Sequence, residues 1–263
     1  MPEGHMLHRI ARDHTEEFGG QCLAISSPQG RFANGARQLD GATLHSVEAH
    51  GKHLCYHWSG EKLLHVHLGL YGKFRLHPIP VPEPRGQVRL RVVGKDKAFD
   101  LNGPSTCEVL TKEQWAAVQQ RLGADPLRID GDVELVWQRI SRSRVAIGSL
   151  LLNQSVIAGV GNIYRSEVLY LLGIHPEIPG QSLAREQVDL LWTKLQSLLR
   201  IGVKYNRIII PEPKDIGKPR SRMNREERLL VYKRSHCSKC NSMIESWLLG
   251  ARKVFACPKC QLR

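Results

Sequence analysis

A long alternating region of this chain is followed by a long region with helical spacing, and that order limits the folds the chain can adopt. From residue 22 to about 110, apolar side chains alternate with polar ones, as in Leu54/Tyr56/Trp58, and clusters of Gly, Pro and Asp interrupt the alternation. From residue 133 to 199, apolar side chains recur at the spacing of helices joined by short glycine-rich turns. We therefore predict an α+β protein in which an antiparallel β-sandwich or barrel precedes a helical domain.

Helices are predicted on both sides of the strand region. Residues 3–18 carry apolar side chains at helical spacing, and a capping box at Thr111 to Gln114 begins a helix that stops at Gly123. A loop-like stretch then separates the strand region from the helical region. The predicted division is a first domain 1–124, a linker 125–132, a helical domain 133–232 and a C-terminal segment 233–263.

The chain begins with Met1-Pro2-Glu3, so removal of Met1 leaves a secondary amine beside a carboxylic acid. An α-amino group has a pKa of about 7.7–8.0, well below the value of about 10.4 for lysine, so much more of it is neutral near pH 7. The start of a helix further disfavours the protonated amine. Pro2 is therefore suited to Schiff-base chemistry on a sugar carbon. The alternative is that Pro2 only permits removal of Met1 and that Glu3 is a helix-start carboxylate.

The net charge of +13 indicates a polyanionic partner, for which nucleic acid is the obvious candidate. Residues 200–263 hold 16 Lys and Arg against 5 Asp and Glu, so we expect that partner to contact the C-terminal quarter. No apolar run is long enough to span a bilayer, and we expect no membrane partner. The first twenty residues lack the apolar core of a secretory signal, which favours a cytoplasmic protein.

Four cysteines near the end form the pattern C-x2-C-x16-C-x2-C, contributed by Cys237, Cys240, Cys257 and Cys260. This spacing is typical of two knuckles that close a tetrahedral zinc site. Four thiolates leave no open coordination position, so we predict one structural Zn²⁺ per chain and no catalytic metal. Arg252 lies on the predicted turn of a β-hairpin before the second pair, from which we expect it to reach a phosphate.

Reactive side chains elsewhere in the sequence are predicted to be structural. Three scattered cysteines, Cys22, Cys55 and Cys107, are expected to act as small buried apolar residues. Two histidines on one predicted strand, His65 and His67, lack neighbours in the sequence that would complete a metal site. We expect their hydrogen bonds to be satisfied locally.

The segment from Gln154 to Tyr164 places two glycines and Asn162 in a turn between two predicted helices, at about 145–152 and 162–172. Glycines allow backbone amides to approach a phosphate closely, and the start of the second helix presents further donors. Asn162 adds a side-chain amide. The turn is thus a candidate phosphate site. For the isolated motif, an equally good alternative is that the glycines only allow the two helices to pack closely.

Taken together, these motifs resemble the formamidopyrimidine-DNA glycosylase and endonuclease VIII family over the whole chain. The family pattern is an N-terminal Pro-Glu, a Gly-Lys on a sandwich strand, a helix-two-turn-helix with Gly-x-Gly-Asn and a C-terminal zinc finger, and each part occurs here in order. The resemblance implies an N-terminal antiparallel β-sandwich flanked by helices. It also implies a C-terminal helix-two-turn-helix domain with a zinc-finger β-hairpin.

The resemblance also implies roles for particular residues. Pro2 matches the nucleophile, Glu3 the general acid, and Lys52 the lysine that grips a phosphate beside the lesion. Asn162 matches the phosphate-binding asparagine, and Arg252 matches the arginine of the zinc finger. We predict that these residues form the catalytic and DNA-binding site.

Two further positions bear on the branch of the family. Leu70-Tyr71 resembles the apolar wedge of the endonuclease VIII branch, and residues 91–101 lack the Arg-Phe pair of the purine-directed branch. The alternative is that Leu70 and Tyr71 pack into the sandwich. His5 and Met6 replace the second Pro-Glu that many members have, so the role of that second carboxylate does not carry over. His5 either replaces it or has no catalytic role.

We therefore predict a bifunctional DNA glycosylase and apurinic/apyrimidinic lyase that excises oxidised bases, preferably pyrimidines, from damaged DNA in base excision repair. We expect a monomer that needs no redox cofactor and associates with the bacterial nucleoid. Two alternatives remain open: a zinc-containing protein that binds damaged DNA without chemistry, and a purine-directed glycosylase of the same family. The preference for duplex or single-stranded DNA, and the choice between β- and β,δ-elimination, are not predicted.

Overall fold

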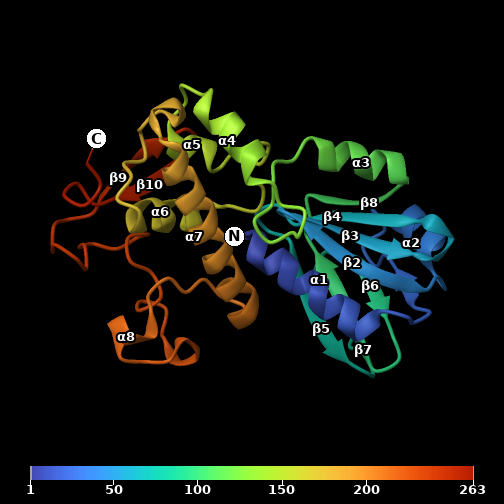
Figure 1. Cartoon of the computed structure of the whole chain (residues 1–263). Helices are drawn as coiled ribbons and strands as arrows, with labels where there is room; N and C mark the ends of the chain where they lie inside the picture. The colour runs from blue at the N-terminus through green and yellow to red at the C-terminus, as the bar shows by residue number, and fades with distance from the viewer. Residues whose placement is uncertain (1, 263) are drawn as a thin grey trace. The chain divides into compact units, whose positions relative to one another are not determined.

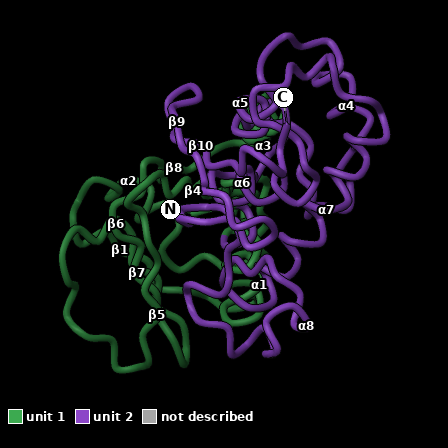
Figure 2. Tube along the Cα trace, turned by 90° about the vertical axis from the view of Figure 1, so that its left-hand side faces the viewer, with its two compact units in different colours: residues 1–3, 7–121 green, residues 4–6, 122–263 purple. Residues whose placement is uncertain are grey.

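The computed structural model describes residues 2–262, which form two compact units (Figures 1 and 2). The N-terminal unit comprises residues 2–3 and 7–121, and the C-terminal unit comprises residues 4–6 and 122–262. The first turn of helix α1 (Gly4–Phe18) is therefore grouped with the C-terminal unit, whereas the rest of this helix belongs to the N-terminal unit.

The N-terminal unit contains two four-stranded antiparallel sheets, with strand orders β1-β6-β7-β5 and β2-β3-β4-β8. Short hairpins join β2 to β3, β3 to β4 and β6 to β7, whereas the other neighbouring strands are not consecutive in the chain. The strands are β1 (Ala24–Ser26), β2 (Leu44–His50), β3 (His53–Trp58), β4 (Leu63–His67), β5 (Lys73–Pro78), β6 (Val88–Val93), β7 (Lys97–Asn102) and β8 (Thr106–Leu110).

Aromatic side chains join the two sheets and confirm the predicted sandwich. Leu54, Tyr56 and Trp58 alternate along β3 and are buried. The ring of Tyr56 lies 6.2 Å from that of Phe99 in the other sheet, measured between centroids. His14 of α1 stacks on Phe99 at 4.4 Å and forms a 2.8 Å hydrogen bond with the Tyr56 hydroxyl. Burial lowers the pKa of His14 to about 4, so this side chain is neutral at pH 7.

Helices α2 (Ala33–Leu39) and α3 (Lys112–Gln120) complete the N-terminal unit, with a short 3-10 turn at Ser59–Glu61. The capping box is confirmed, because Gln114 donates its N–H to Thr111 while its side chain accepts the Thr111 N–H. Helix α3 packs Trp115 against Cys55 on the outer face of the second sheet. It ends three residues before the predicted stop at Gly123.

One expectation about cysteines is wrong. Cys55 is buried and Cys107 is half-buried, but Cys22 is exposed. Cys22 forms an isolated bridge with Thr43 at the margin of the sandwich, outside the named strands, and its thiol lies 3.0 Å from the carbonyl of Gly41. The apolar alternation begins only at the following residue, Leu23, which is fully buried.

The C-terminal unit is helical and ends in an antiparallel hairpin. The predicted helix at 145–152 is reduced to one turn, because Ala146 is its N-cap and Asn153 accepts the N–H of Ser155 to start the next turn. The elements are α4 (Val133–Ser141), α5 (Ile147–Leu150), α6 (Asn162–Leu171), α7 (Arg185–Tyr205), α8 (Pro213–Ile216), β9 (Glu245–Leu249) and β10 (Arg252–Ala256), with short 3-10 turns at Gly180–Ser182 and Arg220–Arg222.

Helix α7 supplies much of the apolar core of this unit. Val188, Leu191, Leu195 and Leu198 follow the spacing of one helix face and are buried against α6 and its neighbours. The helix ends at Asn206, whose φ of 53° places it in the left-handed region typical of a helix C-cap. Between residues 2 and 262, none of the helices combines the length and apolar composition needed to cross a membrane.

Candidate active site and metal centre

Pro2 and Glu3 are buried immediately before α1. Glu3 is the N-cap residue of the helix and is fully buried, but its side chain forms no capping hydrogen bond. The carboxylate thus lies at the positive end of the helix dipole without capping it. The alternative in which Glu3 is only a helix-start carboxylate is compatible with this position, and its role as the general acid stays a prediction. Met1 lies outside the described residues.

The start of α1 is fastened to the glycine-rich turn of the C-terminal unit. The N–H of Gly4 donates to the carbonyl of Gly159 at 2.8 Å, and a Cβ on Gly4 would lie 2.8 Å from the Gly159 Cα. Only glycine permits this approach without a shift of the backbone. His5 is buried beside this clamp, with its ring edge-on to Tyr164 at 5.4 Å. Pro2 and Glu3 therefore directly precede a rigid attachment point.

The side chain of Gln154 hydrogen-bonds to backbone atoms on both sides of the predicted phosphate turn. Its side-chain amide donates to the carbonyls of Leu152 and Val160, and its oxygen accepts the N–H of Gly159 at 3.0 Å. Gly159 has a φ of 88°, in the region that favours glycine. The turn is thus an ordered loop that leads directly into the start of α6.

Asn162 and Arg252, which lie far apart in the sequence, are brought together in the C-terminal unit. The Asn162 amide donates to the carbonyl of Lys253, the residue next to Arg252, at 3.0 Å. Arg165, one turn along α6, donates to the same carbonyl at 2.9 Å and to the Asn162 side-chain oxygen. Sequence reasoning missed Arg165, although its position three residues after Asn162 puts both on one helix face. The phosphate turn and the hairpin are thereby joined.

The remaining predicted DNA contacts lie at hairpins and loops of the N-terminal unit. Lys52 occupies the two-residue turn between β2 and β3, where Gly51 has a φ of 60°. Leu70 and Tyr71 follow β4 and are 54% and 86% exposed. These exposed fractions exclude the alternative in which the pair packs into the sandwich. A role in DNA binding for any of the three stays a prediction.

Stacked histidines next to Lys52 were not identified as a group from the sequence. His53 stacks on His67 with ring centroids 4.5 Å apart and forms a 2.9 Å hydrogen bond with His65. His65 also bonds to Glu108, and His67 bonds to Ser105, which confirms that both histidines are satisfied locally.

The imidazoles of His53 and His67 carry little charge near pH 7. Burial, followed by the neighbouring histidines, lowers the pKa of His53 to about 3. Burial also lowers the pKa of His67, with smaller contributions from His65 and the charge of Lys52. Lys52 is therefore a localised positive charge at this turn, flanked by neutral rings.

The four cysteines of the C-terminal motif form a compact cluster. Their sulfur atoms all lie within 4.8 Å of one another, and the Cys237–Cys260 and Cys240–Cys257 separations are 3.8 and 3.4 Å. Sulfurs that bind zinc at about 2.3 Å in a tetrahedron are roughly 3.8 Å apart. The cluster is therefore a candidate zinc-finger site whose geometry fits the metal.

A buried carboxylate attaches the finger to α6. Glu167 is fully buried and accepts backbone N–H groups from Leu230, Val231 and Tyr232 at 2.9–3.2 Å. Burial raises the pKa of Glu167 to about 7, whereas the N–H donors lower it. The segment that leads into the first cysteine pair is thus held by backbone hydrogen bonds to a single side chain.

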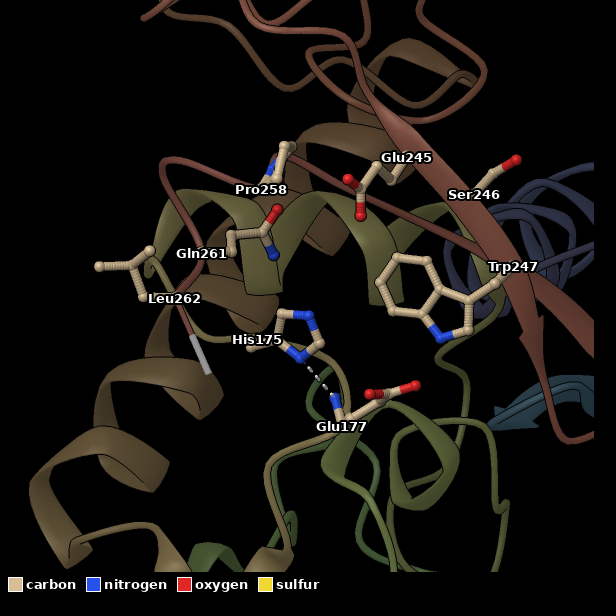
Figure 3. A pocket seen from close by; sticks show the side chains of 8 residues that line it. All are labelled: His175, Glu177, Glu245, Ser246, Trp247, Pro258, Gln261 and Leu262. Carbon is tan, nitrogen blue, oxygen red and sulfur yellow. Dashed lines mark hydrogen bonds between the residues drawn. The ribbon is translucent and has the colours of Figure 1, made fainter.

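A cavity of about 570 Å³ in the C-terminal unit is lined by residues of β9 and by Pro258 and Gln261, which are sequence neighbours of the second cysteine pair (Figure 3). The rings of His175 and Trp247 stack on one side of it, with centroids 5.5 Å apart. The Glu177 N–H donates to His175, and the Glu245 carboxylate faces the cavity from β9. None of the site residues predicted from the sequence lines this cavity.

Comparison with known proteins identifies the family to which the two units are similar. Residues 1–104 match the formamidopyrimidine-DNA glycosylase N-terminal domain, and residues 122–213 match the formamidopyrimidine-DNA glycosylase H2TH domain. "Endonuclease 8 1" of Mycobacterium tuberculosis is 46% identical over 268 residues, which cover 99% of this chain and 100% of the relative. "Endonuclease 8" of Pectobacterium atrosepticum is 29% identical, with 99% and 100% covered.

Solved structures show the same fold. A complex of Lactococcus lactis Fpg (MutM) with DNA containing N7-benzyl-Fapy-dG has a TM-score of 0.84 and 25% identity, and covers all of both chains. The chain belongs to the formamidopyrimidine-DNA glycosylase and endonuclease VIII family. Within that family it resembles the endonuclease VIII branch, since its 46% identity to endonuclease 8 1 exceeds the 26% identity to the Lactococcus lactis formamidopyrimidine-DNA glycosylase.

Proposed function

We propose that this chain removes oxidised pyrimidines from DNA with Pro2 as the nucleophile. Endonuclease 8 and formamidopyrimidine-DNA glycosylase homologues are DNA glycosylases with apurinic/apyrimidinic lyase activity in base excision repair, and the chain is a bifunctional enzyme of this kind. The observation that carries the role of Pro2 is its burial beside Glu3, directly before the clamp between Gly4 and Gly159.

The chemistry follows from an amine and a carboxylic acid at one point. The Pro2 nitrogen attacks C1′ of the flipped nucleotide, and the base leaves with the electron pair of its bond to C1′. Glu3 donates a proton to O4′ as the C1′–O4′ bond breaks, which leaves an iminium ion between Pro2 and the opened sugar. Loss of a C2′ proton then expels the 3′ phosphate by β-elimination.

DNA is held in this proposal by phosphate contacts from both units. Lys52, Asn162 and Arg252 bind the backbone around the lesion, and the strong positive charge of residues 200–263 supplies salt-dependent attraction. Leu70 and Tyr71 enter the base stack as an apolar wedge, which their exposure permits. Solved relatives bound to damaged DNA support this partner.

The four cysteines bind one structural Zn²⁺ in this proposal. When bound, the metal cross-links both ends of the finger, and it supports DNA binding by holding Arg252 on its hairpin. The predicted division into a catalytic domain 1–124, a helical domain 133–232 and a finger 233–263 is part of the same proposal. So are the monomeric state and the location at the bacterial nucleoid in the cytoplasm.

Reductive trapping tests the role of Pro2. Borohydride reduces an iminium ion to a stable amine, so processed protein incubated with abasic-site DNA should form a covalent adduct. An N-terminal extension that retains every side chain but turns the imino nitrogen into an amide should abolish the adduct while DNA binding persists. An adduct of equal yield with the extended protein would exclude Pro2, and absence of any adduct with the processed protein would favour the non-catalytic damage-binding alternative.

A lesion panel tests the substrate preference. The Leu70-Tyr71 pair and the identity to endonuclease 8 relatives support oxidised pyrimidines. Excision of oxidised pyrimidines should therefore be faster than excision of oxidised purines from otherwise identical duplexes. Faster excision of purines would support the purine-directed alternative and leave the proposed Schiff-base chemistry intact.

A further inference from the structure

A second group of potential metal ligands lies on the outer face of the sheet formed by β2, β3, β4 and β8, the face that Trp115 of α3 packs against. Glu48 of β2 is the register partner of Cys55 of β3. His57 lies two residues further along β3, so its side chain projects from the same face as Cys55. The ligand atoms of these three residues all lie within 4.8 Å of one another. Hairpin register, not sequence spacing, brings them together.

The three residues form a small site that is closed on one side. A Glu48 carboxylate oxygen lies 3.2 Å from Nε2 of His57 and accepts the indole N–H of Trp115 at 2.9 Å. Cys55 is fully buried beneath α3, whereas the side chains of His57 and Glu48 are 36% and 31% exposed. A buried sulfur is therefore paired with two ligands that solvent can reach, which provides an entry path for an ion.

We propose that Glu48, Cys55 and His57 bind a Zn²⁺ ion whose fourth position stays open to solvent. One thiolate, one imidazole and one carboxylate suit this borderline-soft ion and do not suit Mg²⁺ or Ca²⁺, which prefer oxygen ligands. The separation between His57 and Glu48 already fits a tetrahedral edge of roughly 3.3 Å, given metal–ligand distances of about 2.0 Å. Trp115 holds the carboxylate from outside, as partners of metal ligands commonly do.

This site should be weaker than the four-cysteine cluster. It has three protein ligands instead of four, and only one is a thiolate. The ion must also displace the proton of a buried thiol, because burial and the nearby Glu48 raise the pKa of Cys55. We therefore expect the cysteine cluster to fill first and the second site to exchange its ion more readily.

Cobalt titration of the full-length, zinc-loaded protein tests the proposal. Zinc in the finger is spectroscopically silent, whereas Co²⁺ bound to a thiolate gives a charge-transfer band in the near ultraviolet. The protein should develop this band with a single end point and then contain one zinc and one cobalt per chain by metal analysis. Cys55→Ser should abolish the band. Cys22→Ser is the matched control, because Cys22 is an exposed thiol outside the cluster, and it should leave the band unchanged.

Two milder variants keep the test decisive if Cys55→Ser does not fold. Glu48→Gln keeps an oxygen that can accept the Trp115 N–H, and His57→Gln changes a partly exposed side chain. Each should weaken cobalt binding at least tenfold. The proposal is overturned if cobalt enters only by expelling zinc from the finger, or if the band and its end point survive in both variants. Either outcome is independent of glycosylase activity.

Discussion

The sandwich of the N-terminal unit and the four-cysteine finger of the C-terminal unit are stabilised in different ways, and the contrast explains what their sequences reveal. The sandwich buries alternating apolar side chains such as Tyr56 and Phe99 across two sheets. The four-cysteine finger instead has sulfur atoms that all lie within 4.8 Å of one another, and it is joined to α6 by buried polar groups, chiefly Glu167 and Arg165, that bind backbone atoms. An apolar core tolerates many individual changes, whereas a fold fastened by a few polar atoms depends on each of them.

Zinc removal should distinguish the finger from the sandwich most clearly. A structural zinc site contributes roughly 10 kcal/mol to the folding of a small metal-dependent segment. Cys257→Ser, or chelation of the wild type, should therefore unfold residues 233–262 and weaken DNA binding, while the sandwich stays folded. Limited proteolysis with mass analysis should show cleavage confined to the finger. If the finger were equally resistant to protease with and without metal, its proposed dependence on zinc would be contradicted.

Lowering the pH should reduce the stability of the sandwich through protonation of His14. Its pKa is lowered from 6.5 to about 4 by burial, so its stabilising contribution is complete above pH 6.5 and is lost as the pH falls towards 4. The shift corresponds to about 3 kcal/mol. Urea unfolding of wild type and His14→Phe at pH 7 and pH 4.5 should show a smaller pH effect in the variant. His45→Gln, at an exposed position, serves as the control and should retain the wild-type pH effect.

Gly4→Ala tests the clamp at the start of α1. The added Cβ would lie 2.8 Å from the Gly159 Cα, so the backbone must move, at a cost of roughly 1–3 kcal/mol. We expect a folded protein with strongly reduced borohydride trapping, because Pro2 and Glu3 precede the displaced residue. Gly20 has a φ of 77°, so Gly20→Ala is also strained, but nothing lies within 4 Å of its Cβ position. Unchanged trapping in Gly4→Ala, or equal loss in Gly20→Ala, would contradict the role of the clamp.

Leu70→Ala should have the smallest effect on folding. Leu70 is 54% exposed, so its truncation should change the free energy of unfolding by no more than about 0.5 kcal/mol. Affinity for lesion-containing duplex should nevertheless fall, whereas affinity for undamaged DNA should change little, because a wedge acts only when a nucleotide is extruded. Fluorescence anisotropy with both duplexes measures the difference. A parallel loss on both would indicate a nonspecific contact.

Patterns that depend on nearby residues could be predicted from the sequence. The alternation around Tyr56, the capping box at Thr111 and the paired cysteines all specify local geometry, and the structure contains each of them. Long-range polar contacts could not be predicted, because nothing in the sequence marks Arg165 as a partner of Lys253. The exposure of Cys22 was also missed, since the alternation does not reveal where the core begins.

The central claim is that the imino nitrogen of Pro2 becomes bonded to deoxyribose during turnover. Peptide mapping of the borohydride-reduced adduct with abasic-site DNA tests it most directly. We predict that the sugar remnant is carried by the N-terminal peptide, on the nitrogen of Pro2, in protein that has lost Met1. A remnant found instead on Lys52 or on another lysine would contradict the account.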